Sequence, residues 1–470
     1  MNSEQSIPQS RRKFFENVAG AGAANVIAAR VVANAAPANR PNIVYIHSHD
    51  SGRYLQPYGY AVPTPNLQRL AAEGVLFRRA FSGAPTCSPS RSILLTGQWA
   101  HQNGMLGLAH RGFSLHDYKK HIVHTLRGAG YRSVLAGLQH VAAKPETVGY
   151  DEILRPKTTS AVDVAPGAVE FLDRRPQQPF FLDVGFFETH REFQKPGPAE
   201  DPRYIQPPIP IPDTPETRAD MAGYHASARV LDEGVGRVLN ALERNGVAEN
   251  TIVISTTDHG VAFPLMKCNL EDAGWGVSLI LRGPGAFRGG KVSDALISQI
   301  DLYPTICDVL GIERPAWLQG KSILPVLRGE KQAINEQVFA EVTYHAAYEP
   351  KRAVRTDRWK YIRRFGSRRT PVLPNCDDGF SKSLWLNNGW KNQQLPTESL
   401  YDLVFDPTEH HSLVNDPSAS EVLADMRKRL DRWMQATADP ILKGDVPAPH
   451  GAQINDPDGI SPREKPLVVG

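Results

Sequence analysis

The chain has 470 residues, of which 41% are hydrophobic and 22% are charged, a composition that excludes disordered, collagen-like and membrane-embedded proteins. Its 53 basic and 50 acidic residues give a formal net charge of +3, which excludes the basic surface of a dedicated nucleic-acid-binding protein. The four cysteines are scattered and show no CxxC spacing, so neither a disulfide framework nor a structural zinc site is indicated.

The first 36 residues are typical of a twin-arginine signal peptide. Arg11 and Arg12 precede a weakly apolar, alanine-rich stretch that runs through Val32, and small residues over 33–36 suit a signal peptidase. The alternative is a basic disordered arm. Because the apolar stretch is shorter than the roughly 20 residues of a bilayer crossing, we expect no stable membrane span. The twin-arginine translocase would then deliver a folded, periplasmic or secreted protein.

Four short apolar runs, each typical of a buried strand, end in polar residues. The runs cover residues 42–46, 132–137, 180–187 and 250–255, and they lead into His49 and Asp50, His140, His190, and Asp258 and His259, respectively. Helical patterns lie between them, the clearest from Met221 to Leu242. Alternating strands and helices predict a mostly parallel sheet covered on both faces, with the carboxyl ends of its strands at one edge. We therefore expect the polar ends to lie together.

From about residue 336 the pattern changes to short alternating segments, such as 353–362, that predict a small antiparallel sheet. Residues 366–395 are rich in Pro, Gly and Asn and predict a long loop, whereas 421–434 show helical periodicity. The expected organisation is a signal peptide over 1–36, a large α/β domain over 40–335, a smaller C-terminal α+β subdomain over 336–440 and an extended tail over 441–470.

The most specific motif begins at Cys87. It reads Cys-Ser-Pro-Ser-Arg over residues 87–91 and Leu-Thr-Gly over residues 95–97. This pattern resembles the CxPSRxxxLTG signature of the sulfatase family, in which a separate formylglycine-generating enzyme oxidises the cysteine to formylglycine (3-oxoalanine). The structural alternative is a buried free cysteine at the start of a helix.

The resemblance implies a hydrated aldehyde at Cys87. One of its two hydroxyls would attack the sulfur of the substrate and displace an alcohol or amine, and deprotonation of the other would expel sulfate and restore the aldehyde. A serine hydroxyl could not release its sulfate ester in this way. A nearby cation would be needed to lower the pKa of the attacking hydroxyl.

Metal-binding candidates lie at the polar strand ends. Asp50 and Asp258 resemble the metal-binding carboxylates of sulfatases, and His259 stands where the family carries Asn or His. His49 departs from the usual Asp-Asp pair, and its imidazole makes the site softer, which favours Mn²⁺ or Zn²⁺ over the Ca²⁺ that is most common in the family. His49 could instead be a structural histidine, and His47 on the same strand face is a weaker candidate. The expected ligands of one divalent metal ion are His49, Asp50, Cys87, Asp258 and His259.

Further residues would bind the negatively charged sulfate group of the substrate. Arg91, one helical turn after Cys87, could orient the converted residue and the bound anion. His140 and His190 resemble the family's acid-base histidines, which also hold the leaving group. Lys267 resembles the basic residue that contacts sulfate, and its alternative is a solvated surface lysine.

One departure concerns the second signature. Sulfatases usually carry Gly-Lys-x-His there, whereas this chain has Leu138 in place of the lysine. Loss of one preorganised donor can lower the rate roughly 10²–10³-fold. Lys144 and Lys267 are the candidate substitutes. Tyr344, His345 and Tyr348 are candidates either for substrate contacts or for purely structural roles.

The resemblance covers roughly residues 41–440 and looks closest to the heparan N-sulfoglucosamine sulfohydrolase (sulfamidase) branch, judged from segments 101–105, 145–148 and 299–305. It implies an alkaline-phosphatase-like α/β fold with a smaller C-terminal α+β subdomain. The implied activity is hydrolysis of a sulfate ester or sulfamate in a sulfated saccharide, such as a glycosaminoglycan, or in a small organic sulfate. Two alternatives stay open: a phosphodiesterase or phosphonate monoester hydrolase of the same superfamily, and a noncatalytic binder of sulfated glycans.

Overall fold

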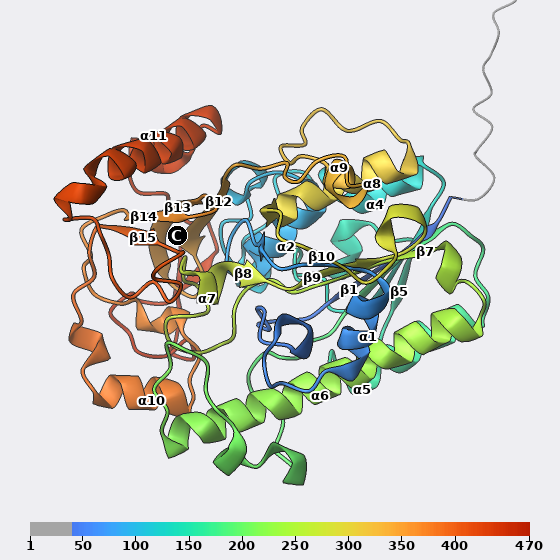
Figure 1. The fold of residues 1–470 in the computed structure, drawn as a ribbon, viewed down its shortest axis with the longest axis horizontal. Helices are drawn as coiled ribbons and strands as arrows, with labels where there is room; N and C mark the ends of the chain where they lie inside the picture. Colours follow the sequence, from blue (N-terminus) through green and yellow to red (C-terminus); the bar gives the residue numbers. More distant parts are fainter. Residues whose placement is uncertain (1–39) are drawn as a thin grey trace, which may run out of the picture. The chain divides into compact units, whose positions relative to one another are not determined.

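An eight-stranded sheet forms the centre of the larger part of the protein (Figure 1). In spatial order its strands are β10 (Lys291–Ser293), β2 (Val75–Phe77), β9 (Leu279–Arg282), β7 (Thr251–Thr256), β1 (Asn42–His47), β6 (Phe180–Gly185), β4 (Arg132–Gly137) and β5 (Glu152–Leu154). β1 pairs in parallel with β6 and β7, and β4 pairs in parallel with β5 and β6, whereas β9 runs antiparallel to both of its neighbours. The predicted mostly parallel sheet is confirmed.

This computed structural model describes residues 40–470, which belong to one compact unit. The predicted signal peptide over residues 1–36 lies outside the described residues. Within residues 40–470, none of the helices combines the length and apolarity that a bilayer crossing requires.

The central sheet is buried on both faces because alternate side chains of its strands enter two apolar cores. On β1, Ile43 and Tyr45 enter one core, and Val44 and Ile46 enter the other. The first core includes side chains of α2 (Cys87–Thr96), α4 (Ile122–Gly128), α8 (Leu302–Leu310) and α9 (Leu324–Leu327). The second includes side chains of α1 (Pro65–Glu73), α5 (Ala161–Asp173) and α6 (Pro215–Arg244). Figure 1 shows these two groups of helices on opposite sides of the sheet.

The bounds of α6, the helix predicted over 221–242, follow from its terminal residues. The Thr214 hydroxyl accepts a hydrogen bond from the backbone N–H of Thr217, and Pro215 occupies the first helical position, where a missing N–H does no harm. The helix ends at Arg244, and Gly246 adopts φ +68°, a left-handed conformation that favours glycine.

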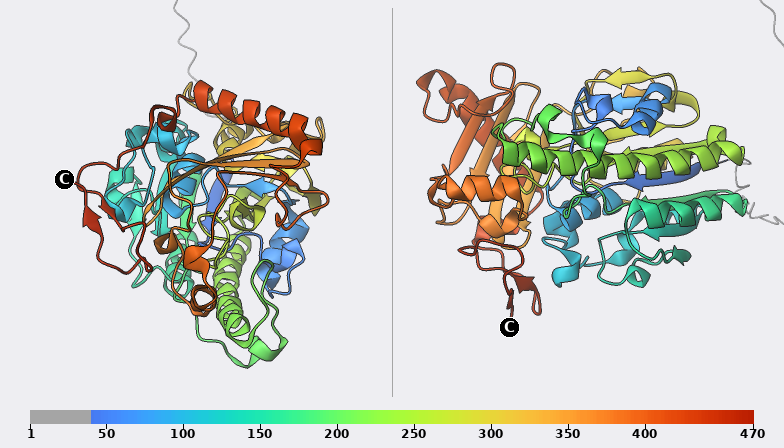
Figure 2. Two further views of the ribbon diagram at one scale, coloured as in Figure 1. Left: turned by 90° about the vertical axis from the view of Figure 1, so that its left-hand side faces the viewer. Right: turned by 90° about the horizontal axis from the view of Figure 1, so that it is seen from below.

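A four-stranded antiparallel sheet forms the C-terminal part, as predicted. Its strands are β12 (Val338–Tyr344), β13 (Tyr348–Arg355), β14 (Trp359–Arg364) and β15 (Glu398–Asp402). One face packs on α11 (Ser420–Ala436), which contains the helix predicted over 421–434 and lies along the sheet in Figure 2. The other face packs against Phe81 and Trp275 of the larger part.

Shorter elements complete the described secondary structure. They are the three-stranded sheet of β3 (Ala80–Phe81), β8 (Gly276–Val277) and β11 (Ile297–Ser298), and the helices α3 (Ala100–Asn103) and α7 (Asp272–Trp275).

Two predictions for the C-terminal part were incomplete. Residues 366–395 are not one long loop, because α10 (Phe380–Asn387) forms within them, and Trp385 packs in a small apolar cluster with Leu373. The tail over 441–470 is not wholly extended, since β16 (Gln453–Ile454) pairs with β17 (Leu467–Val468). In both cases the neighbouring Pro- and Gly-rich sequence predicted loops, whereas tertiary contacts stabilise short regular elements there.

His121 makes the stability of this fold sensitive to acid. Its Nδ1 accepts a hydrogen bond from the backbone N–H of Val123 at the start of α4, and burial lowers the pKa of the imidazole to about 3. The unfolded chain would bind a proton here below about pH 6.5, whereas the folded chain would not. The contribution of His121 to stability is therefore complete above pH 6.5 and decreases as the pH falls towards 3.

We expect His121→Asn to keep the helix cap but to remove this acid sensitivity. Between pH 7 and pH 5, the free energy of unfolding should fall by about 2 kcal/mol less in the variant than in the native chain. Urea unfolding followed by circular dichroism at the two pH values measures this difference. Equal losses in both proteins would contradict it.

Candidate active site

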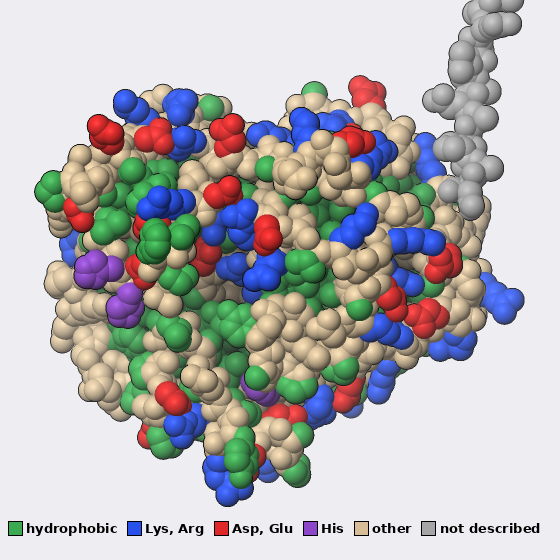
Figure 3. Space-filling view, in the orientation of Figure 1, with side chains coloured by type: hydrophobic (Ala, Val, Ile, Leu, Met, Phe, Trp, Pro, Cys, Tyr) green, Lys and Arg blue, Asp and Glu red, His purple; other side chains and the backbone are tan. Residues whose placement is uncertain are grey.

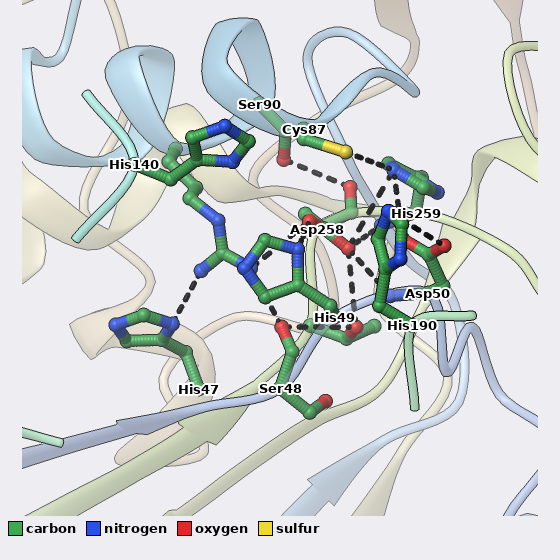
Figure 4. Close-up of polar contacts among 12 residues, drawn as sticks. His47, Ser48, His49, Asp50, Cys87, Ser90, His140, His190, Asp258 and His259 are labelled. Atoms are coloured by element: carbon green, nitrogen blue, oxygen red, sulfur yellow. Dashed lines mark hydrogen bonds and ion pairs between the residues drawn. The ribbon is translucent and has the colours of Figure 1, made fainter. Parts of the chain in front are cut away.

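The carboxyl ends of β1, β4, β6 and β7 bring the predicted polar residues together at one edge of the sheet (Figure 4). These residues are His49 and Asp50 after β1, His140 after β4, His190 after β6, and Asp258 and His259 after β7. Cys87, the first residue of α2, joins them, and it is 1% exposed. Ligand atoms of His49, Asp50, Cys87 and Asp258 all lie within 4.8 Å of one another.

Local backbone geometry turns these side chains inward. Asp50 and His140 adopt φ values of +52° and +56°, which end their strand segments in sharp turns. The backbone N–H of Asp50 donates to Oδ1 of Asp258 at 2.9 Å, and the N–H of His259 donates to the same oxygen at 3.0 Å. The ends of neighbouring strands β1 and β7 are thereby fixed to each other.

Arg91 neutralises Asp258 in the interior. Its Nη2 donates to Oδ2 of Asp258 at 2.9 Å and to the Ser48 carbonyl at 2.8 Å. Burial alone would raise the pKa of Asp258, but His259 and Arg91 hold that pKa well below its usual value. His47 supports this pair: its Nδ1 contacts Nη1 of Arg91, and its Nε2 lies 2.9 Å from Asp183. His47 therefore lies behind Arg91.

Lys267 neutralises Asp50 in the same way. Its Nζ lies 2.9 Å from Oδ2 of Asp50, 2.7 Å from Oδ2 of Asp377 and 3.2 Å from Nε2 of His190. Burial would lower the pKa of Lys267, but Asp377 and Asp50 together raise it well above the usual value. The alternative of a solvated surface lysine is wrong, because the side chain is completely buried. Asp377 was not predicted as a site residue, because it lies in the segment that was expected to be a loop.

Cys87 faces His259 across the site. Its Sγ lies 3.2 Å from Nε2 of His259, whose Nδ1 is 2.9 Å from the Gly260 carbonyl. Nδ1–H must therefore donate to that carbonyl, which leaves Nε2 to accept from the thiol. Burial raises the pKa of the Cys87 thiol well above its usual value. The cysteine is thus a neutral thiol at the start of α2, where backbone N–H groups favour a bound anion.

Two histidines flank this centre. His190 donates from Nδ1 to the Arg191 carbonyl at 2.5 Å, so its Nε2 accepts from Lys267. Nε2 of His140 lies 2.9 Å from Nδ1 of His110, a residue that the sequence analysis did not single out. No motif marks His110, and only its contact with His140 identifies it.

The remaining residues that the sequence offered as candidates for substrate contacts, or for replacing the missing lysine, have structural roles or lie outside the polar centre. Lys144 is exposed, so it does not replace the missing lysine. The hydroxyl of Tyr344 donates to the Val446 carbonyl, and that of Tyr348 accepts from the Val446 N–H, so both tyrosines are used in packing. His345 is buried. Burial and, after it, the charge of Lys267 lower the pKa of its imidazole well below the usual value, while Asp377 acts in the opposite direction, which places His345 beside the site.

The donor set fits a divalent cation. Within residues 40–470, Oδ1 of Asp50 and Nε2 of His49 are buried and have no hydrogen-bond partner. The three carboxylates of Asp50, Asp258 and Asp377 face the two cations Arg91 and Lys267, which leaves one negative charge uncompensated among these five groups.

A groove of about 1110 Å³ borders the site. Its lining includes Lys267, Cys268, Tyr58, Trp385 and Trp390, but not Cys87. Figure 3 looks onto the molecule in the orientation of Figure 1 and shows apolar and basic side chains side by side on this surface. The groove therefore meets the polar centre at Lys267.

Comparisons with known proteins agree with this geometry. The sulfatase family model matches residues 41–312, and the model named N-sulphoglucosamine sulphohydrolase, C-terminal, matches residues 267–371. N-sulphoglucosamine sulphohydrolase of Homo sapiens is 31% identical over 477 residues, which cover 89% of this chain and 92% of the human protein. Delta 4,5-hexuronate-2-O-sulfatase of Bacteroides thetaiotaomicron is 28% identical over 458 residues, covering 83% of this chain and 86% of that protein.

A solved structure shares the fold. It is a complex with the substrate D-glucosamine-2-N,6-O-disulfate, and it superposes with a TM-score of 0.68 at 19% identity, over 89% of this chain and 99% of its own. This likeness confirms the alkaline-phosphatase-like architecture with its C-terminal antiparallel sheet.

We expect Asp377→Asn to destabilise the protein more than the same change at the next residue. The variant removes one of two carboxylates from the buried Lys267, and hydrogen bonds to charged groups contribute about 1.5–3 kcal/mol. Asp378→Asn is the comparison: Asp378 also pairs with a buried lysine, Lys382, but it is itself 34% exposed, so solvent replaces part of the lost interaction and the loss of stability should be smaller than for Asp377→Asn. Urea unfolding measures both, and equal effects would contradict the prediction.

Proposed function

The chain belongs to the sulfatase family of sulfuric ester hydrolases, and we propose that it hydrolyses a sulfate ester or sulfamate group of a sulfated saccharide. The observation that carries the proposal is the position of Cys87. The residue begins α2, and its Sγ lies 3.2 Å from His259 beside Asp50 and Asp258. We propose that Cys87 is converted to formylglycine, which supplies one hydroxyl to attack sulfur and a second whose deprotonation releases sulfate.

We propose that His49, Asp50, Asp258 and His259 hold one divalent ion next to residue 87. The ion supplies positive charge that lowers the pKa of the attacking hydroxyl. The buried, unpartnered oxygen of Asp50 and ring nitrogen of His49 within the described chain support this assignment. The two imidazoles favour Mn²⁺ or Zn²⁺ over Ca²⁺.

Lys267 and the first turn of α2 would bind the sulfate group. Lys267 is buried, its pKa is raised, and it lies between Asp50 and His190, so it stays charged where the anion must bind. We propose that it takes the role of the lysine that Leu138 replaces. Arg91 would act indirectly, since its guanidinium holds Asp258 in place.

His190 would transfer a proton, and His140 would accept hydrogen bonds. We propose that His190, which is 24% exposed and contacts Lys267, takes up a proton at Nε2 when the substrate binds and then delivers it to the departing oxygen or nitrogen. Burial, together with His49 and His110, lowers the pKa of His140 well below its usual value. His140 therefore stays neutral and accepts hydrogen bonds from the substrate or from the hydroxyls at residue 87.

A saccharide substrate is supported by the groove and by the relatives. The names of the human and the Bacteroides enzymes both refer to sulfated sugar units. The groove of about 1110 Å³ is slightly larger than the roughly 300–1,000 Å³ typical of small-molecule pockets. It offers room beside Lys267 for the remainder of a glycosaminoglycan fragment.

We also propose how the mature protein arises. A formylglycine-generating enzyme would convert Cys87, and the twin-arginine translocase would recognise Arg11 and Arg12 and export the folded chain. The enzyme would then act in the periplasm or outside the cell.

We expect Cys87→Ala to lower kcat/KM for a sulfated saccharide at least about 10⁴-fold, because no other group replaces the nucleophile. Coexpression with a maturation enzyme should convert Cys87 to the aldehyde, as shown by mass spectrometry of its peptide. Cys307→Ala, a change at another buried cysteine on α8, is the control and should keep activity.

Full activity of Cys87→Ala would refute the nucleophile. A persistent thiol with retained affinity for sulfated saccharides would favour the noncatalytic binder, the reading that Leu138 supports.

Paired kinetics distinguish sulfur from phosphorus chemistry. We expect kcat/KM for an aryl sulfate to exceed that for the matching aryl phosphonate monoester in the converted protein, because the family's members act on sulfuric esters. A large preference for the phosphonate would instead assign the chain to the phosphonate monoester hydrolases.

A further inference from the structure

Cys87 belongs to a second possible set of metal ligands. Its Sγ and one ring nitrogen each of His49 and His140 lie within 4.8 Å of one another. Around a tetrahedral Zn²⁺, with bonds of about 2.0–2.3 Å, ligand atoms are separated by roughly 3–4 Å, so small side-chain movements would close the set. This set contains no carboxylate, and His140 is not among the ligands proposed above. Figure 4 draws Cys87 and His140 on the same side of the His49 ring.

His49 is oriented as zinc-binding histidines usually are. Its Nδ1 lies 3.1 Å from Oδ2 of Asp258, so Nδ1–H faces a carboxylate. Both ring nitrogens of His49 are buried and have no hydrogen-bond partner in the part of the chain that the structure describes. A nearby carboxylate can fix the tautomer of a metal-binding histidine, and either nitrogen of His49 has a lone pair available for a metal.

His140 shows the same arrangement with a different partner. Its Nε2 lies 2.9 Å from Nδ1 of His110, so Nε2–H can donate to His110. Its Nδ1 is buried and likewise unpartnered among residues 40–470. His49 and His140 therefore each offer at least one unpartnered ring nitrogen, and one ring nitrogen of each lies within 4.8 Å of Sγ of Cys87.

The charges nearby also suit a cation. In the family pattern a lysine stands two residues before His140, but this chain has Leu138 there. Arg91 is already paired with Asp258. A metal-bound cysteine is a thiolate, so binding of a divalent ion would release the thiol proton of Cys87 to solvent.

We propose that the unconverted thiol form of the chain binds one Zn²⁺ through Cys87, His49 and His140, with a fourth position open to water. Conversion to formylglycine removes the sulfur, so this site and the proposed catalytic state exclude each other. The inference rests on the proposed function only for the existence of the converted form. A chain that escapes conversion is then a metal-binding, hydrolytically inactive protein.

Co²⁺ serves as the spectroscopic probe for this site. The chain is expressed without a maturation enzyme, its thiol at Cys87 is verified by mass spectrometry, and the metal-free protein is titrated with Co²⁺. We expect one equivalent to produce a thiolate-to-cobalt charge-transfer band and visible bands of four-coordinate intensity. Zn²⁺ should abolish these bands by competition. Absence of the charge-transfer band in the folded thiol form would overturn the proposal.

Variants test each ligand. Cys87→Ser should lose the charge-transfer band, and His140→Gln should weaken Co²⁺ binding at least about 100-fold. His110→Asn should weaken it about 10–100-fold, as expected for a residue that orients a ligand. Cys307→Ser is the matched control and should bind as the native chain does. If Asp50→Asn abolished binding while His140→Gln bound normally, the ion would lie among the carboxylates and the proposal would be wrong.

The outcomes separate this inference from the proposed function. If the converted protein hydrolyses sulfate groups while the thiol form shows no charge-transfer band, the zinc site alone fails. If the band appears in the thiol form while the converted protein is inactive, the proposed hydrolysis alone fails. Conversion of Cys87 should remove the band in either case.

Discussion

The burial of two carboxylates at the ends of adjacent parallel strands is the constraint on which the site depends. Asp50 follows β1 and Asp258 follows β7, and the pairing of these strands places the two side chains next to each other. Removing such charges from water costs several kcal/mol per ion unless each is paired. Lys267 and Arg91 provide the pairing, and each binds one carboxylate oxygen. The second oxygen of Asp258 accepts hydrogen bonds from the backbone N–H groups of Asp50 and His259, whereas the second oxygen of Asp50 has no hydrogen-bond partner within residues 40–470.

The balance of charge then determines what this space can hold. Three carboxylates and two cations leave a net negative centre, which attracts a divalent cation before it attracts an anion. With that cation present the balance becomes positive, and the first turn of α2 and Lys267 can bind a sulfate group. Cys87 lies where the cation and the anion would meet. The same electrostatic order supports both proposals, a metal-dependent hydrolase and a thiol form that binds metal.

The parts of the site that the sequence predicted are those that follow from local pattern. Apolar runs that end in polar residues indicate parallel strands, whose carboxyl ends must share an edge, and the motif at Cys87 is continuous in sequence. Asp377 and His110 were missed because their roles arise from contacts with Lys267 and His140 across the fold. Composition also gave one wrong prediction. The proline- and glycine-rich segment 366–395 was expected to be a loop, yet it contains a helix and places Asp377 in the site.

Two departures from the family pattern compensate each other in charge. A histidine at position 49 in place of aspartate removes one negative charge, and a leucine at position 138 in place of lysine removes one positive charge. Neither change alone would suit a buried site, because either would leave one charge without its partner. Together they preserve the charge balance while exchanging a carboxylate and an ammonium group for an imidazole and an apolar side chain. In the proposed metal site, an imidazole is a softer ligand than the carboxylate of the family pattern, which favours nitrogen- and sulfur-preferring metals.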